Sequence, residues 1–115
     1  MESCIFCRVA KKEIPSPFLY EGKDVIAFAD IQPQAPTHIL IIPKKHYRDL
    51  GEIPESEIGV VQEMFQAARQ LAKQAGVDER GYRLAMNVKS EGGQSVFHVH
   101  MHLLAGKQMG PSLVG

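Results

Sequence analysis

Three histidines alternate with apolar residues near the carboxyl end of the chain, at His98, His100 and His102. Side chains two residues apart on a β-strand point to the same face of the sheet, and they lie roughly 6–7 Å apart. The alternation therefore predicts a strand over 96–104 that carries three imidazoles on one face. Alternate histidines on a strand can also bind zinc or line a solvated edge, so this pattern alone leaves those readings open.

The four residues before this strand, Gly92-Gly93-Gln94-Ser95, favour phosphate chemistry. Glycines let backbone amides turn inward to form a concavity that holds anions, and Ser95 adds a hydroxyl donor. An ordinary imidazole is largely neutral at pH 7 and can attack phosphorus directly. A covalent intermediate on His100 would then divide one difficult displacement into two easier ones.

Hydrophobic periodicity predicts an α+β fold with a five-stranded antiparallel meander sheet, a short N-terminal helix and one long central helix. The helices are expected over 4–12 and 54–75, the second closed by Gly76. The strands are expected over 18–21, 25–29, 37–42, 83–88 and 96–104. The residues expected to form the buried face of the long helix are spaced three or four apart: Ile58, Val61, Phe65, Ala68, Ala72 and Ala75.

Length and charge limit the classes of function. A chain of 115 residues fits one domain, predicted over 1–115. Thirteen basic and thirteen acidic residues give no net charge, which disfavours nucleic acid and membrane partners because both need a concentrated positive face. An acidic residue at position 2 and no apolar run behind it argue against a secretory signal, so a cytoplasmic location is expected.

Cys4 and Cys7 have the spacing of half a zinc site. A redox dithiol and two unligated thiols are the competing interpretations. The redox reading is disfavoured because the pair does not follow a strand and open a long helix. A structural disulfide is disfavoured in a reducing compartment.

Several motifs together resemble the histidine-triad (HIT) family. His98 to Leu104 matches its signature of three histidines alternating with apolar residues, and the stretches 30–38 and 42–46 are also similar to the family. Gly92 to Phe97 and Gly106 to Met109 resemble its Hint branch, the nucleoside phosphoramidases. The resemblance covers residues 4–109 and implies cleavage of purine nucleoside 5′-phosphoramidates.

The resemblance also implies roles for individual residues. His100 corresponds to the nucleophile, with His102 and His38 steadying charge on the phosphate and Ser95 assisting the leaving group. Asp30 corresponds to the carboxylate that binds the ribose hydroxyls. The phosphate and leaving-group contacts correspond to Asn87, Gly93, Gln94 and Ser95, and the base pocket to Ile5, Phe6, Val9, Ile14, Phe28, Ile31 and Leu40. Family members with an N-terminal Cys-x-x-Cys imply a structural zinc, not required for chemistry, on Cys4, Cys7, His46 and His98.

Other readings remain beside these. Asp30 and Asn87 can simply cap turns, and the apolar residues can simply be core. Dinucleoside polyphosphate hydrolysis and a non-catalytic nucleotide-binding regulator are the alternative functions. The resemblance further implies a homodimer, paired through the long helix and the strand over 83–88. The chain has no tryptophan, whereas some Hint relatives carry one near this end, so the leaving amine stays open.

Overall fold

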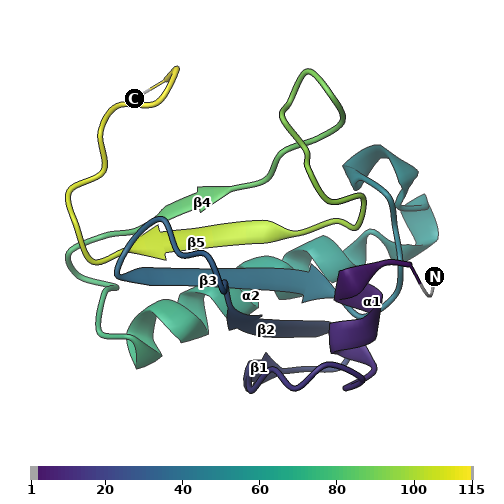
Figure 1. Cartoon of the computed structure of the whole chain (residues 1–115). Helices are drawn as coiled ribbons and strands as arrows, with labels where there is room; N and C mark the ends of the chain where they lie inside the picture. Colours follow the sequence, from purple (N-terminus) through teal and green to yellow (C-terminus); the bar gives the residue numbers. More distant parts are fainter. Residues whose placement is uncertain (1–2, 115) are drawn as a thin grey trace.

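The computed structural model describes residues 3–114 as one sheet flanked by two helices (Figure 1). Two short 3-10 turns, Leu50–Glu52 and Glu55–Glu57, lead into the longer helix. The helices and strands, in chain order, are α1 (Ile5–Ala10), β1 (Phe18–Glu21), β2 (Val25–Ala29), β3 (Thr37–Pro43), α2 (Gly59–Gln74), β4 (Arg83–Ala85) and β5 (Met101–Ala105).

The sheet has five strands in the order β1-β2-β3-β5-β4, and every pairing is antiparallel. The predicted α+β class is thereby confirmed. One detail departs from a simple meander, because β5 lies between β3 and β4. The chain leaves β3 through α2, which is about 24 Å long for its 16 residues, and returns at the outer edge. The inner position then goes to β5, which buries alternate residues, whereas β4 buries none completely.

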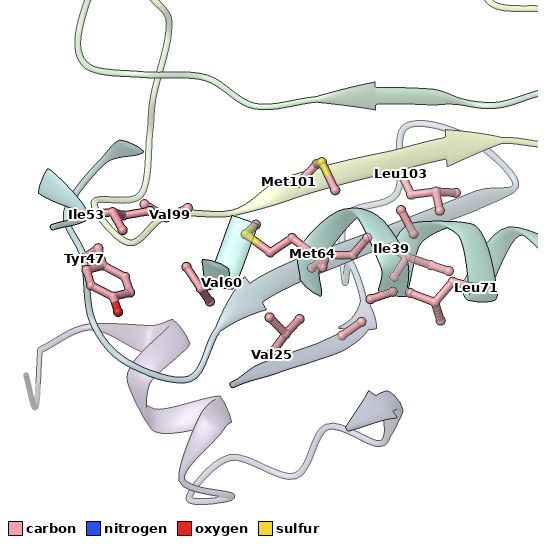
Figure 2. Packing of buried hydrophobic residues seen from close by; sticks show 14 of the residues in the cluster. Val25, Ile39, Tyr47, Ile53, Val60, Met64, Leu71, Val99, Met101 and Leu103 are labelled. Atoms are coloured by element: carbon pink, nitrogen blue, oxygen red, sulfur yellow. The ribbon is translucent and has the colours of Figure 1, made fainter. Parts of the chain in front are cut away.

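The two faces of the sheet pack against different partners. Ile39 and Ile41 of β3 join the larger core with α2, and Figure 2 shows Met64 of that helix among the sheet residues. Leu40 and Ile42 point to the opposite face and pack with Phe6 of α1 in a second cluster. Because successive strand residues alternate in direction, β3 is buried on both sides.

The buried face of α2 differs from the one expected. Ile58 and Phe65 are 43% and 49% exposed. The helix begins at Gly59 instead of 54, and the stripe that includes Met64 and Leu71 packs in the core against the sheet. Ala68 and Ala72 belong to both stripes, so spacing alone did not distinguish them. The residues that α2 buries are Val60, Met64, Ala67, Ala68, Leu71 and Ala72.

The end of α2 follows the prediction. Gly76 has φ +71°, its N–H donates to the carbonyl of Lys73, and that of Val77 donates to Ala72. This is the hydrogen-bond pattern of a glycine-terminated helix.

The last strand is shorter than expected and begins at Met101 instead of 96. Residues before it form other backbone contacts, and the N–H of Val99 donates to the carbonyl of Tyr47 at 2.8 Å. The alternation nevertheless continues through this segment, because Val99 packs in the α2 core while His98 and His100 contact Phe6 of α1. Likewise β4 ends at Ala85 instead of 88.

Within residues 3–114, no helix combines the length and the apolar character needed to cross a membrane.

Candidate functional site

A row of imidazoles lies on the sheet face that α1 partly covers. His102 pairs with Leu40 in the register of β5 and β3, and His38 stands two residues earlier on β3. The ring centres of His38 and His102 are 5.1 Å apart, as are those of His102 and His100. The sequence placed His98, His100 and His102 on one face, and the His100–His102 distance is somewhat shorter than the roughly 6–7 Å expected for an extended strand. His38 joins this row from β3.

Hydrogen bonds determine where the protons lie on His38 and His102. The backbone N–H of Gln34 can only donate, so Nδ1 of His38 accepts at 3.0 Å and the proton of that neutral ring lies on Nε2. This Nε2–H faces Nδ1 of His102 at 2.9 Å and the Oδ2 atom of Asp30 at 3.4 Å. The proton of a neutral His102 must therefore lie on its Nε2.

His100 has the opposite arrangement. Its Nδ1 is 2.7 Å from the carbonyl oxygen of His98, which can only accept, so Nδ1 carries the proton and Nε2 keeps its lone pair. No hydrogen bond from residues 3–114 reaches that Nε2, and within this part of the chain no fully buried side-chain nitrogen or oxygen lacks a partner. The Nε2 atom of His100 therefore remains accessible, as a nucleophile requires.

Burial keeps His102 neutral. Removal from water, followed by the neighbouring rings of His100 and His38, lowers the pKa of His102, and Asp30 opposes this only weakly. At pH 7 the group beside His100 is therefore a neutral imidazole with a donor N–H.

Cys4, Cys7, His46 and His98 converge at the opposite end of the row. Their sulfur and nitrogen ligand atoms all lie within 4.8 Å of one another. Nδ1 of His98 is 3.4 Å from Sγ of Cys4 and 3.5 Å from Sγ of Cys7, and Nδ1 of His46 is 3.2 Å from Sγ of Cys7. Neither cysteine forms a disulfide. The four residues thus form a possible zinc site.

The geometry and protonation of this cluster suit zinc. A tetrahedral zinc with bonds of about 2.0–2.3 Å separates its ligand atoms by roughly 3.3–3.8 Å, which these distances approach. Nε2 of His98 donates to the carbonyl of Pro43 at 2.9 Å, which leaves Nδ1 as a lone pair aimed at the sulfurs. Burial lowers the pKa of His98 to about 4, so the ring is neutral at pH 7.

Asp30, His38 and His102 also bring three possible ligand atoms together. Here the facing nitrogens already share a hydrogen bond, and Nδ1 of His38 accepts from the backbone. A hydrogen-bonded chain therefore explains this group without a metal.

The loop before His98 is only partly free to bind a phosphate. The N–H groups of Gly93 and Gln94 donate to the carbonyls of Ser90 and Lys89 and close a turn, in which Gly93 has φ +79°. The side-chain amide of Gln94 is buried and bonds to the backbone of Arg48, Lys89 and Val96. Ser95 is exposed. The predicted phosphate contact at Gly93 and Gln94 stays a prediction, and Ser95 adds an exposed hydroxyl to the loop.

The remaining predicted nucleotide contacts are distributed around the row. Asp30 accepts from the backbone N–H of Gln32 at 2.8 Å, so it does cap a turn while its Oδ2 faces His38. Asn87 is exposed, two residues beyond the end of β4. Ile31 is 88% exposed.

The residues of the predicted base pocket differ widely in exposure. Phe6, Val9, Phe28 and Leu40 are buried in the second core cluster, and Ile14 packs against it. Ile5 is 47% exposed on α1. Most of these residues thus pack in one cluster, of which Phe6 contacts the rings of His98 and His100, and their role toward a base stays a prediction.

Several groups that shape the site were missed by sequence reasoning. The carbonyl of Pro43 orients His98, and the N–H of Gln34 orients His38. Every residue type has a backbone carbonyl and nearly every type a backbone N–H, so the sequence does not indicate which of them will bind a histidine. Arg48 and Phe97 were missed as well. The guanidinium carbon of Arg48 lies 5.2 Å from the ring centre of Phe97, beside a pocket next to Ser95.

Comparison with known proteins gives consistent matches. A family model described as HIT domain matches residues 11–109. The purine nucleoside phosphoramidase of Escherichia coli strain K12 is 45% identical over 112 residues, covering 97% of this chain and 94% of the relative. A 14 kDa zinc-binding protein of Zea mays is 48% identical over 107 residues, covering 91% and 83%. A histidine triad protein structure from Clostridium difficile superposes with a TM-score of 0.93 at 45% identity, covering 97% of both chains.

Proposed function

The chain belongs to the HIT domain family, and on that premise we propose that it hydrolyses purine nucleoside 5′-phosphoramidates through a covalent nucleotide adduct on His100. One observation carries the proposal. Nε2 of His100 keeps its lone pair because the carbonyl of His98 holds the proton on Nδ1, and no hydrogen bond from residues 3–114 engages that lone pair. The similarity to the Escherichia coli phosphoramidase supports the choice of substrate class.

The first half-reaction joins the nucleotide to the enzyme. The Nε2 lone pair of His100 forms a bond to the α-phosphorus while the bond from phosphorus to the leaving nitrogen breaks. The departing amine is a poor leaving group unless it receives a proton. The hydroxyl of Ser95 supplies that proton, and the nucleotide stays joined to Nε2 of His100 through its α-phosphorus.

Water completes the reaction. Its oxygen attacks phosphorus, the bond from phosphorus to His100 breaks, and the group that protonated the amine recovers a proton from the water. The products are the free amine and the nucleoside monophosphate. Asp30 binds the ribose hydroxyls in this proposal. The Nε2–H of His102 stabilises the charge that develops on the phosphate oxygens, and His38 steadies that ring through the hydrogen bond to its Nδ1.

Replacing His100 tests the proposal. The variant His100→Ala is expected to retain the fold but to lose at least about a thousandfold of the rate on adenosine 5′-phosphoramidate, the scale of losing a nucleophile. Wild-type enzyme quenched in denaturant at alkaline pH, where a phosphorus–histidine bond survives, should show AMP bound to His100 by mass spectrometry, and the variant should not. An unchanged rate in the variant would refute the assignment.

A comparison of substrates separates the alternative functions. Faster hydrolysis of a dinucleoside polyphosphate than of a phosphoramidate would favour the first alternative. Nucleotide binding without turnover of either substrate would favour the regulatory one.

We further propose that Cys4, Cys7, His46 and His98 hold a structural zinc that the chemistry does not require. The ligand distances support this, and so does similarity to a relative named as zinc-binding. A bound zinc would connect α1 to the segment after β3 and to the segment before β5. Protein purified without chelator is expected to contain about one zinc per chain, and Cys7→Ser is expected to lower both the metal content and the melting temperature while turnover persists. No zinc, with both thiols freely alkylated, would contradict the proposal.

We also propose a homodimer, a single HIT domain over 1–115 and residence in the cytoplasm. Among residues 3–114 no further strand pairs with the outer edge of β4, and Phe65 of α2 is a half-exposed aromatic residue, so both predicted pairing elements retain surface for a second copy. The single sheet and the family match over 11–109 support one domain.

A further inference from the structure

A pocket of about 410 Å³ opens beside the row of histidines. The proposed reaction and the proposed zinc site each involve some of its lining residues, but no ligand has yet been assigned to the pocket itself. It lies between the start of α1, the segment after β3 and the loop before β5. The residues that line it are Ser3, Cys4, Ile5, His46, Arg48, Ser95, Val96 and Phe97.

The pocket adjoins the reacting centre through Ser95, which belongs both to its wall and to the predicted phosphate contacts. Val96 also lines it and packs against the cluster that contains Phe6. The ring of Phe6 lies 5.2 Å from that of His100. A substituent on phosphorus that passes Ser95 would therefore enter this pocket.

The order of residues along the row of histidines indicates which substituent on phosphorus would enter the pocket. Asp30, assigned to the ribose, is near His38 at one end, and His98 lies near Cys4 and His46 at the other, with His100 between. The pocket adjoins the second end. It therefore suits the group attached to phosphorus on the side away from the ribose, which is the leaving amine.

The charge of the pocket is one-sided. None of its lining residues carries a carboxylate, and Arg48 supplies a cation. The guanidinium of Arg48 is supported on the ring of Phe97 and forms no ion pair with residues 3–114. The Glu52 carboxylate nearby is bound by the backbone N–H of Arg48. The backbone carbonyl of Arg48 accepts a hydrogen bond from the side chain of Gln94. This bond anchors the segment around Arg48 to the loop that contains Ser95.

We propose that this pocket is the leaving-group subsite and that it favours amines which carry a carboxylate and an apolar side chain, as an N-linked amino acid does. The inference rests on the proposed phosphoramidase function. Arg48 binds the carboxylate, because a planar guanidinium matches its geometry. Val96 and Phe97 contact the apolar side chain. Arg48 is thus a specificity-determining residue.

Two matched substrates test this inference. Adenosine 5′-phosphoramidate N-linked to phenylalanine carries the carboxylate, and the one N-linked to phenethylamine lacks only that group. The wild-type enzyme is expected to favour the first by roughly three- to tenfold in kcat/KM, mainly through KM, since an exposed charge pair contributes modestly. Raising the salt concentration should reduce the preference because Arg48 is exposed.

Variants assign the preference to Arg48. In Arg48→Gln the ratio of the two kcat/KM values is expected to fall toward one. In Arg48→Lys, which keeps the charge, part of the preference should persist. In the control Arg80→Gln the ratio should equal that of the wild type. Melting temperatures confirm that the compared proteins are folded. Equal rates on both substrates in the wild type, or an equal loss on both in Arg48→Gln, would overturn the subsite while the phosphoramidase function stands. Hydrolysis of neither would overturn both.

Discussion

The carboxylate of Asp30 has two neighbours that give it two different tasks. One oxygen accepts from the N–H of Gln32 and closes a turn, and the other lies 3.4 Å from Nε2 of His38. The sequence left turn capping and ribose binding as competing interpretations, and the geometry allows both.

Replacing Asp30 by Asn separates these tasks. An asparagine oxygen can still accept from Gln32, so the melting temperature of Asp30→Asn should change little. The loss of a charged acceptor for the ribose hydroxyls, worth about 1.5–3 kcal/mol, is expected to raise KM roughly ten- to a hundredfold. Steady-state kinetics on adenosine 5′-phosphoramidate measure this. A large loss of stability with an unchanged KM would leave Asp30 with the structural task alone.

Acid should destabilise the metal-free protein through His98. Burial lowers the pKa of this ring to about 4, compared with 6.5 in the unfolded chain. Above pH 6.5 both states are neutral. Below pH 6.5 the unfolded chain takes up a proton first, so stability falls until the pH reaches about 4.

Urea unfolding in the presence of a chelator measures this effect. The free energy of unfolding at pH 5 is expected to be about 2 kcal/mol lower than at pH 7.5 from His98 alone. The lowered pKa of His102 acts in the same direction. Equal stability at the two pH values, or an NMR titration of His98 near pH 6.5, would contradict the burial argument.

At the level of elements, α2 shows that spacing can identify a helix and still misassign its buried face. Ala68 and Ala72 were expected in the core and lie there, but Phe65 does not. The tertiary packing selects the stripe through Met64 and Leu71, which faces the sheet.

A pair of neighbouring substitutions in α2 tests that packing. Met64 is fully buried, so Met64→Ala is expected to cost about 2–4 kcal/mol of unfolding free energy through lost burial and a cavity. Gln66→Ala, on the exposed side of the same turn, should change it by less than about 0.5 kcal/mol. Denaturant unfolding compares the two, and similar costs would argue against this orientation of α2.

For the whole molecule, the outer edge of β4 is the feature that bears on assembly. An unpaired edge strand offers free N–H and carbonyl groups to another strand, and a second copy can use the same edge about a two-fold axis. Light scattering is expected to give a mass near twice the 12.8 kDa of one chain. A monomeric mass at all concentrations tested would exclude the homodimer.

The sequence by itself determined the features that depend on local order along the chain. The strand hairpin over 18–29, the termination of α2 at Gly76 and the common face of His98, His100 and His102 all follow from turn residues and side-chain periodicity, and the structure contains each of them. The family resemblance, carried by the same local motifs, also agreed with the comparisons.

Only the tertiary structure decided which atoms are free to react. Nδ1 of His100 is protonated because a carbonyl faces it, and Nδ1 of His98 is a lone pair because Pro43 accepts from the other nitrogen. The stripe of α2 that meets the sheet, the inner position of β5 and the pocket around Arg48 likewise depend on segments distant in the chain. The physical reason is the same throughout: periodicity is a property of neighbouring residues, whereas a proton's position or a buried face depends on partners that only folding brings into contact.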